Sequence, residues 1–228
     1  MIVRMGLLQK RPELSALDFR RHWRDSHGAL AAQLPGLRRY HQNHVVERAQ
    51  RGIDYARGPH DVDGFSQLWF DDVPSMSAAF ATEKTKELAV DEARFIGNLK
   101  LITAIQHVVV NPPRALPLVK RMSTLKRCGD VSSEQFLREW FDVHSMLVKR
   151  LPEVRGYRQN FIFDRAHGRG SAASYEDLPI DGVVELWFEN TESIDAAFAS
   201  DAGKTLMVHA SEFIAEISTF LVETHEIV

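Results

Sequence analysis

Phe19-Arg-Arg-His-Trp23, followed by His27, Leu34-Pro35 and Tyr40-His-Gln-Asn43, returns in the second half of the chain as Phe136-Leu-Arg-Glu-Trp140, His144, Leu151-Pro152 and Tyr157-Arg-Gln-Asn160. A second stretch, Asp63-Gly64 with Leu68-Trp69-Phe70, returns as Asp181-Gly182 with Leu186-Trp187-Phe188. Each unit is about 110 residues long, well beyond the roughly 20–50 residues of a solenoid repeat. We therefore expect two tandem domains, over residues 1–110 and 118–228, joined by a proline-rich linker over 111–117.

The composition is that of an ordinary globular protein, with 44% hydrophobic and 26% charged residues and a formal net charge of −3 over 228 residues. Basic residues are scattered and balanced by acids, which argues against nucleic acid as a partner. The single cysteine, Cys128, excludes an intrachain disulfide and fits a reducing compartment. No apolar run approaches the roughly 18–20 residues that span a bilayer, and a charge comes early for a signal peptide. We expect a soluble, cytoplasmic protein with no membrane partner.

Hydrophobic periodicity predicts the same order of elements in each unit, namely a strand, a helix, two strands, a helical stretch and a last strand. In copy one these cover residues 2–8, 15–34, 39–46, 64–70, 72–95 and 101–110. In copy two a capping box at Ser132 starts the first helix, and the later strands cover residues 158–163, 182–188 and 218–228. Polar loops at 47–62 and 164–180 separate the middle strands. The order is the ferredoxin-like βαββαβ motif.

Each unit of this kind covers only one face of its sheet with helices, so the bare face needs a partner. The strand Gly182–Phe188 is apolar at almost every position, as expected where both sheet faces are buried. We therefore expect an α+β fold in which the two sheets face each other and close a barrel within one chain. Further association into homodimers stays open.

The spaced motifs Phe-x3-Trp-x3-His, Leu-Pro-x2-Arg-x-Tyr-x-Gln-Asn and Asp-Gly-x3-Leu-Trp-Phe, with an Ala-Ala-Phe-Ala helix, occur once in each copy. They resemble the EthD family of the dimeric α+β barrel superfamily. Members are usually single units that pair, and this chain resembles a fused pair. The resemblance implies cofactor-independent chemistry on small oxygenated organic molecules. Relatives include methylmuconolactone isomerases and polyketide dehydratases, whereas the founder, from an ether-degradation cluster, has no settled chemical role.

One histidine on the first helix of each copy is the main catalytic candidate. His27 follows Trp23 by four residues and His144 follows Trp140 likewise, so each shares the helix face that points at the sheet. Such a residue is either a general acid or base in a pocket or a core histidine satisfied by its neighbours. The resemblance implies the catalytic role, because the helix-one histidine is catalytic in the isomerase relatives. We expect both imidazoles to reach into a chamber enclosed by the two sheets.

Polar residues on the strands supply partners for these histidines. Tyr40 and Tyr157 are equivalent, as are Gln67 and Glu185 on the next strand, and all should be buried and in need of hydrogen bonds. We expect Glu185 to pair with His144 in copy two, while copy one offers His27, Tyr40 and Gln67 without a carboxylate. The alternative is that Glu185 pairs with an arginine such as Arg121 and has no chemical role.

Large side chains and amides complete the candidate substrate-binding set: Trp23, Trp69, Trp140, Trp187, Gln67, Asn43 and Asn160. Four tryptophans favour an aromatic or alicyclic substrate, although rings of this size are also ordinary core residues. The two asparagines orient a substrate carbonyl or bind strand backbone.

No metal site is expected, because His41-x-x-His44 lies on a strand without a third ligand. No cofactor is expected either, with haem as the alternative: His209 replaces Asp91 on the second helical stretch, where some haem-binding relatives carry a histidine. The sequence thus favours a cofactor-independent lyase, dehydratase or isomerase that moves a proton next to a carbonyl or lactone. The alternatives are a non-catalytic protein that binds a small hydrophobic molecule in a degradation pathway, and a haem-binding oxygenase-like barrel.

Overall fold

The computed structural model describes residues 1–113, 116–168 and 171–228. Positions 114–115 of the expected linker and 169–170 of the second expected polar loop lie outside the described residues. Copy one contains β1 (Ile2–Lys10), α1 (Ala16–His22), η1 (Trp23–His27), α2 (Gly28–Ala31), β2 (Arg39–Glu47), β3 (Gly64–Phe70), α3 (Val73–Phe80), α4 (Glu83–Phe95) and β4 (Ile96–Val110).

Copy two repeats this order and adds one short strand. It contains β5 (Val119–Arg127), α5 (Ser133–Arg138), η2 (Glu139–His144), α6 (Ser145–Val148), β6 (Gly156–His167), β7 (Ser171–Ala172), β8 (Gly182–Phe188), α7 (Thr191–Ala199), α8 (Asp201–Ser211) and β9 (Ile214–Glu226). β6 continues to His167, beyond its predicted end at 163, because it pairs with β4 as far as Lys100. The predicted second helical stretch is two helices in each copy.

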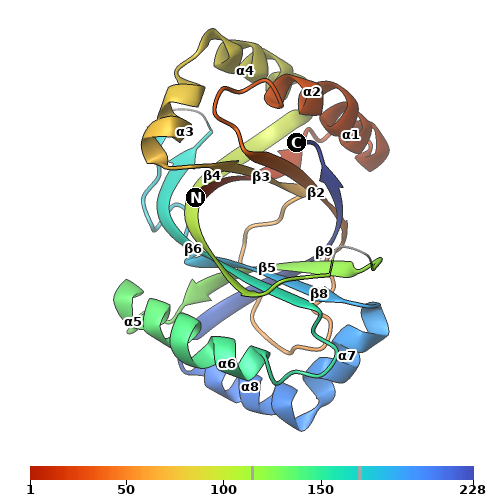
Figure 1. Cartoon of the computed structure of the whole chain (residues 1–228), viewed down its shortest axis with the longest axis vertical. Coiled ribbons are helices and arrows are strands. Elements are labelled where there is room, and N and C mark those ends of the chain that lie inside the picture. The colour runs from red at the N-terminus through yellow and green to blue at the C-terminus, as the bar shows by residue number, and fades with distance from the viewer. Residues whose placement is uncertain (114–115, 169–170) are drawn as a thin grey trace.

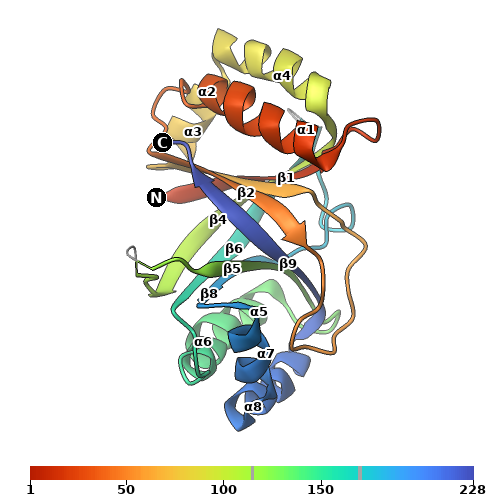
Figure 2. The same cartoon turned by 90° about the vertical axis from the view of Figure 1, so that its right-hand side faces the viewer.

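The strands close into an antiparallel barrel in the order β4-β1-β3-β2-β9-β5-β8-β6, with β6 returning to β4 and β7 attached to β6 (Figure 1). Two seams join the copies, β2 with β9 and β4 with β6. Figure 2 shows β2 and β9 side by side although they lie far apart in the sequence. The prediction of ferredoxin-like units that close one α+β barrel within the chain is confirmed.

The helices form the outer layers of the molecule. Those of copy one cover one side of the barrel and those of copy two the opposite side (Figure 1). Both predicted helix starts are confirmed, since Ser15 Oγ accepts the backbone N–H of Asp18 and Ser132 Oγ accepts that of Gln135. Within the described residues, no helix has the length and apolar character needed to cross a membrane.

The barrel interior is filled by side chains, so the predicted chamber between the two sheets is wrong. Every barrel strand contributes to it, and Phe65 of copy one meets Phe220 of copy two with ring centroids 5.4 Å apart. Its apolar cluster consists of Val3, Met5, Leu7, Val45, Val62, Phe65, Trp69, Ile102, Ala104, Met122, Ile162, Leu178, Ile180, Val183, Phe220 and Val222.

A buried polar group lies inside the barrel, where the two copies meet. Gln67 Nε2 donates to Glu185 Oε1 at 2.9 Å, and these two residues occupy equivalent positions in the two copies. The other carboxylate oxygen of Glu185 lies 2.7 Å from Lys120 Nζ, with both side chains almost fully buried. Lys120 also donates to Asn43 Oδ1 at 2.8 Å. Two carboxylates at these equivalent positions would repel each other, whereas the amide of Gln67 donates a hydrogen bond to Glu185.

Candidate functional site

The first helix of each copy widens into a π-helical segment that ends on the candidate histidine. η1 ends at His27 and η2 ends at His144. Such segments are rare and often lie at functional sites. The two imidazoles are 6% and 8% exposed, so the predicted orientation toward the sheet, away from solvent, is correct.

A glycine on the neighbouring strand makes room for the tryptophan that precedes each histidine. A Cβ atom on Gly64 would lie 2.2 Å from the ring of Trp23, and one on Gly182 would lie 2.4 Å from the ring of Trp140. The repeated Asp-Gly and Phe-x3-Trp motifs therefore belong to one packing unit, in which the indole of the helix packs directly against the backbone of the strand glycine.

Each histidine lines its own pocket between the helical layer and the outer face of the sheet. In copy one His27 lines pocket 1 together with Arg4, Trp23, Tyr40 and Glu92. The cavity volume of pocket 1 is about 40 Å³, which is room for roughly two or three waters. The predicted position of the imidazoles is therefore corrected: they lie outside the barrel wall, one per copy.

The histidine of pocket 1 belongs to a buried histidine–carboxylate pair whose acid, Asp91, does not itself line the pocket. His27 Nδ1 lies 3.0 Å from Asp91 Oδ2, and Asp91 is 5% exposed. The other carboxylate oxygen of Asp91 lies 2.9 Å from His22 Nε2. Since Asp91 accepts a hydrogen bond from Nδ1–H, a neutral His27 ring carries its unprotonated nitrogen at Nε2. That nitrogen lies 3.8 Å from Glu92 Oε1, and the Glu92 side chain also lines the pocket.

Tyr40 presents a hydroxyl at the same pocket. Its oxygen accepts the indole N–H of Trp23 at 3.2 Å and the amide N–H of Gln42 at 2.9 Å. With two donors on the oxygen, the O–H of Tyr40 must point in a third direction. Burial raises the pKa of Tyr40, so the phenol keeps its proton at neutral pH and remains a hydrogen-bond donor.

Pocket 2, in copy two, has no acidic residue in its lining, and its histidine has no carboxylate partner among the described residues. Asp91 corresponds to His209 and Glu92 to Ala210, and His144 Nδ1 lies 3.2 Å from His209 Nδ1. Burial, followed by the charge of His209, lowers the pKa of His144 to about 3. His144 is therefore neutral at physiological pH and has no carboxylate to fix its tautomer.

The predicted pair of Glu185 and His144 is wrong, because the two side chains lie on opposite faces of β8. Val184 and Leu186 line pocket 2 with His144, so Glu185 between them points into the barrel. The alternative partner Arg121 is wrong for the same reason: it lines pocket 2, and the ion-pair partner is Lys120. The carboxylate beside a helix-one histidine is in copy one, contrary to prediction.

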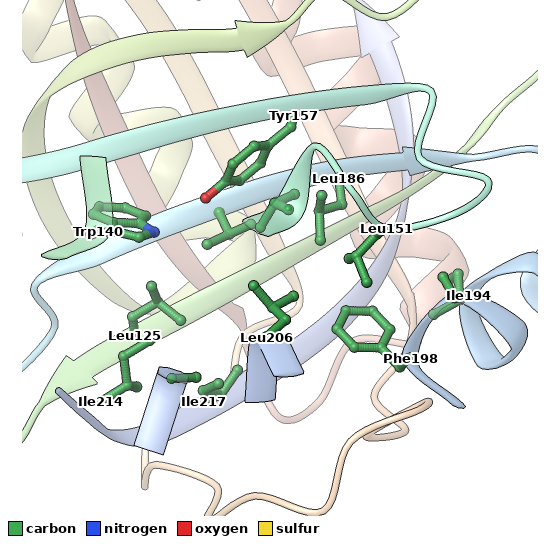
Figure 3. Packing of buried hydrophobic residues seen from close by; sticks show 14 of the residues in the cluster. Leu125, Trp140, Leu151, Tyr157, Leu186, Ile194, Phe198, Leu206, Ile214 and Ile217 are labelled. Carbon is green, nitrogen blue, oxygen red and sulfur yellow. The ribbon is translucent and has the colours of Figure 1, made fainter. Parts of the chain in front are cut away.

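The remaining predicted residues divide between the two faces of the sheet. Trp23 lines pocket 1, and Tyr157 lines pocket 2 with Trp140 beside it (Figure 3). The asparagines bind strand backbone and the interior polar group: Asn43 Nδ2 donates to the carbonyl of Phe65 at 3.1 Å and Asn160 Nδ2 to that of Val183 at 3.0 Å. The predicted substrate-binding residues that line neither pocket are Asn43, Asn160, Gln67, Trp69, Trp140 and Trp187.

Asp91, Glu92 and His22 were not predicted as site residues. The signal was present in the sequence of α4, because Leu88, Asp91 and Phe95 are the buried residues of this helix and follow helical spacing. An acid on the apolar face of a helix requires a partner, and the histidines of the first helix are that partner.

The residues around His209 do not fit a haem group. Its Nδ1 faces His144 and its Nε2 lies 3.3 Å from Glu139 Oε2, so both ring nitrogens have partners. The ring also stacks on His144, with centroids 5.4 Å apart, and it does not line pocket 2. An axial ligand needs a ring nitrogen that faces open space.

The family profile of the EthD domain matches the chain twice, over residues 11–98 and 129–216. The chain belongs to the EthD domain family. An EthD family protein from Bacillus halodurans C-125 is 25% identical and covers 45% of this EthD chain and 96% of its own, with a TM-score of 0.37. A comparison with curated proteins finds no match.

Two further solved structures span nearly the whole of this EthD chain. An anthrone oxidase-like protein gives a TM-score of 0.64 at 11% identity, covering 99% of this chain and 92% of its own. A dye-decolorizing peroxidase from Bacteroides thetaiotaomicron VPI-5482 gives 0.56 at 7% identity, covering 97% and 92%. At these identities the likeness shows the fold alone, so the chemistry has to be argued from the pockets.

Proposed function

We propose that pocket 1 is the active site of a cofactor-independent lyase, dehydratase or isomerase that acts on a small oxygenated cyclic or aromatic compound. The observation that carries this proposal is the buried pair of His27 and Asp91, 3.0 Å apart, with His27 among the residues that line the pocket. A buried imidazole whose tautomer is fixed by a carboxylate is the usual arrangement of a general base.

The proposed reaction begins with proton transfer. His27 Nε2 takes a proton from the carbon next to a carbonyl or lactone group, and the electron pair moves onto the carbonyl oxygen. That oxygen accepts a hydrogen bond from the hydroxyl of Tyr40, which stabilises the enolate. Carboxylates of Asp91 and Glu92, at 3.0 and 3.8 Å, flank the imidazolium that forms.

The second half of the reaction uses the same proton. In an isomerase His27 returns it to a different carbon. In a dehydratase it passes to a β-hydroxyl group, which leaves as water while the double bond forms. Arg4, Trp23 and Leu68 line the same pocket and hold the substrate beside these groups.

The two copies differ in the group that contacts the helix-one histidine, which this chemistry requires to be a carboxylate. His144 contacts a second imidazole where His27 contacts a carboxylate. We therefore assign the reaction to copy one, and this comparison supplies a matched control within one molecule.

The test is hydrogen–deuterium exchange at carbon, followed by NMR on a panel of β-hydroxyketones and unsaturated lactones. His27→Gln should lower the exchange rate by roughly 100-fold to 10,000-fold, the usual contribution of a general base. His144→Gln, the matched substitution in copy two, should leave the rate within about twofold. Equal losses in both variants would contradict the assignment, and absence of exchange or turnover over the whole panel would favour a protein that only binds its ligand.

A further inference from the structure

Pocket 2 is an apolar pocket with one buried cation at its edge. Aliphatic and aromatic side chains make up most of its lining, and the polar residues among the lining are Arg121, Ser123, His144 and Tyr157. His144 is neutral at physiological pH for the reasons given above. The pocket therefore carries one positive charge, on Arg121.

The guanidinium of Arg121 is incompletely paired. Arg121 is 3% exposed, its Nη1 donates to the backbone carbonyl of Arg51 at 3.0 Å, and its Cζ lies 4.7 Å from the ring centroid of Phe198. Its buried Nε has no hydrogen-bond partner, and none of the described carboxylates lies within 4.0 Å of this guanidinium. Burial lowers the pKa of Arg121 to about 9, although the charge of Asp195 acts in the opposite direction. A buried cation with no carboxylate in direct contact is costly unless an anion completes the site.

Copy one shows what is missing from pocket 2. The equivalent pocket 1 is lined by Arg4 and also by the carboxylate of Glu92, whereas pocket 2 has Ala210 at the Glu92 position. Duplication has thus left an arginine in both pockets and an acid in one. Compared with pocket 1, pocket 2 therefore lacks one negative charge beside its arginine.

We propose that pocket 2 is a binding site for an apolar monocarboxylic acid, whose carboxylate pairs with Arg121 and whose hydrocarbon part lies among the aliphatic lining. A planar carboxylate matches the guanidinium edge that carries Nε. A multiply charged anion such as phosphate is excluded by the apolar walls, because Arg121 alone cannot compensate it. This site is separate from His27 and does not depend on the function proposed for pocket 1.

The ligand would be enclosed by both copies of the repeat. Ile53, on the segment after β2 of copy one, lines pocket 2, and Gly52 packs against Phe198 of copy two. The same segment holds Arg121 through the carbonyl of Arg51. Figure 2 shows this segment running from β2 down beside β9 toward the helices of copy two. A carboxylate on Arg121 therefore also contacts the junction between the copies.

The test is calorimetric titration of the full chain with benzoate and, as the neutral probe, benzyl alcohol. A charged hydrogen bond contributes about 1.5–3 kcal/mol, so benzoate should bind at least about tenfold more tightly than benzyl alcohol. Arg121→Met should abolish this preference, and the matched variant Arg4→Met should keep it. The proposal would be overturned if the wild-type protein showed no preference for benzoate over benzyl alcohol. It would also be overturned if Arg121→Met kept this preference, or if Arg4→Met alone lost it.

Thermal unfolding provides a second readout that separates binding from folding. Without benzoate, Arg121→Met should unfold at the same or a higher temperature than the wild type, because it removes an unpaired buried charge. Benzoate should raise the unfolding temperature of the wild type and leave that of Arg121→Met unchanged. Ser123→Leu, which fills the pocket and keeps Arg121, should lose binding of both probes; retained binding would place the ligand elsewhere.

Discussion

The buried ion pair inside the barrel yields the prediction with the clearest magnitude. Glu185→Gln removes the carboxylate and leaves the ammonium of Lys120 with two amide oxygens, Asn43 Oδ1 at 2.8 Å and Gln67 Oε1 at 3.3 Å. Removing one partner of a buried pair costs about 3–5 kcal/mol of unfolding free energy, because the other charge stays behind.

The pKa of Glu185 leads to a similar value for the unfolding free energy that this carboxylate contributes. Burial alone raises this pKa, but the charges of Lys120 and Arg158 and the hydrogen bonds to the carboxylate lower it from 4.5 to about 2. That difference corresponds to about 3 kcal/mol at pH 7. Because the folded pKa lies below the unfolded one, this stability is present above about pH 4.5 and is lost as the pH falls toward 2.

Urea unfolding followed by circular dichroism at pH 7 measures the loss of unfolding free energy in Glu185→Gln. The residues of copy one indicate a double variant that should restore most of this stability. Lys120→Val with Glu185→Gln gives copy two the residues that copy one has at Val3 and Gln67. The double variant should lie within about 2 kcal/mol of wild type, since apolar replacement of a buried pair is often nearly neutral. A loss of unfolding free energy below about 1 kcal/mol in Glu185→Gln would refute the reasoning. So would a double variant whose loss equals the sum of the losses in Lys120→Val and Glu185→Gln.

Two further predictions concern the packing of copy two. His144 has a folded pKa of about 3 against an ordinary 6.5, so its contribution to stability is full above pH 6.5 and falls by about 1.4 kcal/mol per pH unit below it. Urea midpoints between pH 7 and 4 should therefore fall more steeply for wild type than for His144→Gln, and parallel curves would contradict this. Gly182→Ala places a Cβ 2.4 Å from the Trp140 ring and should cost about 1–3 kcal/mol in thermal unfolding. The control Gly129→Ala, with nothing within 4 Å, should cost under about 0.5 kcal/mol, and equal shifts would refute the packing argument.

The sequence was sufficient to predict the fold because several local signals agreed with the repeat. Ser15 and Ser132 fix the helix starts, and the apolar run Gly182–Phe188 indicates a strand buried on both faces, as the structure shows. The need to cover a bare sheet face then leads to the barrel. None of these signals depends on side chains that are distant in sequence. The grouping of Gln67 with His27 and Tyr40 is wrong, because Tyr40 lines pocket 1 whereas Gln67 donates to Glu185 inside the barrel.

The candidate site was predicted only in part, because its pairings depend on which face of the sheet is the barrel interior. Alternation shows that Glu185 and Val184 point opposite ways, but it does not say which of them faces His144. The acid that pairs with His27 lies 64 positions away on α4. Only the packing of α4 on the first helix brings Asp91 to His27, and sequence spacing alone does not reveal that contact.

The most direct test of the account is the protonation state of the His27 ring, read from a long-range ¹H–¹⁵N NMR spectrum at a pH where the imidazole is neutral. The account predicts a proton on Nδ1, held by Asp91, and none on Nε2, with a shift toward the other tautomer in Asp91→Asn. A wild-type ring protonated at Nε2, or one that Asp91→Asn leaves unchanged, would contradict the claim that Asp91 prepares His27 as the base of pocket 1.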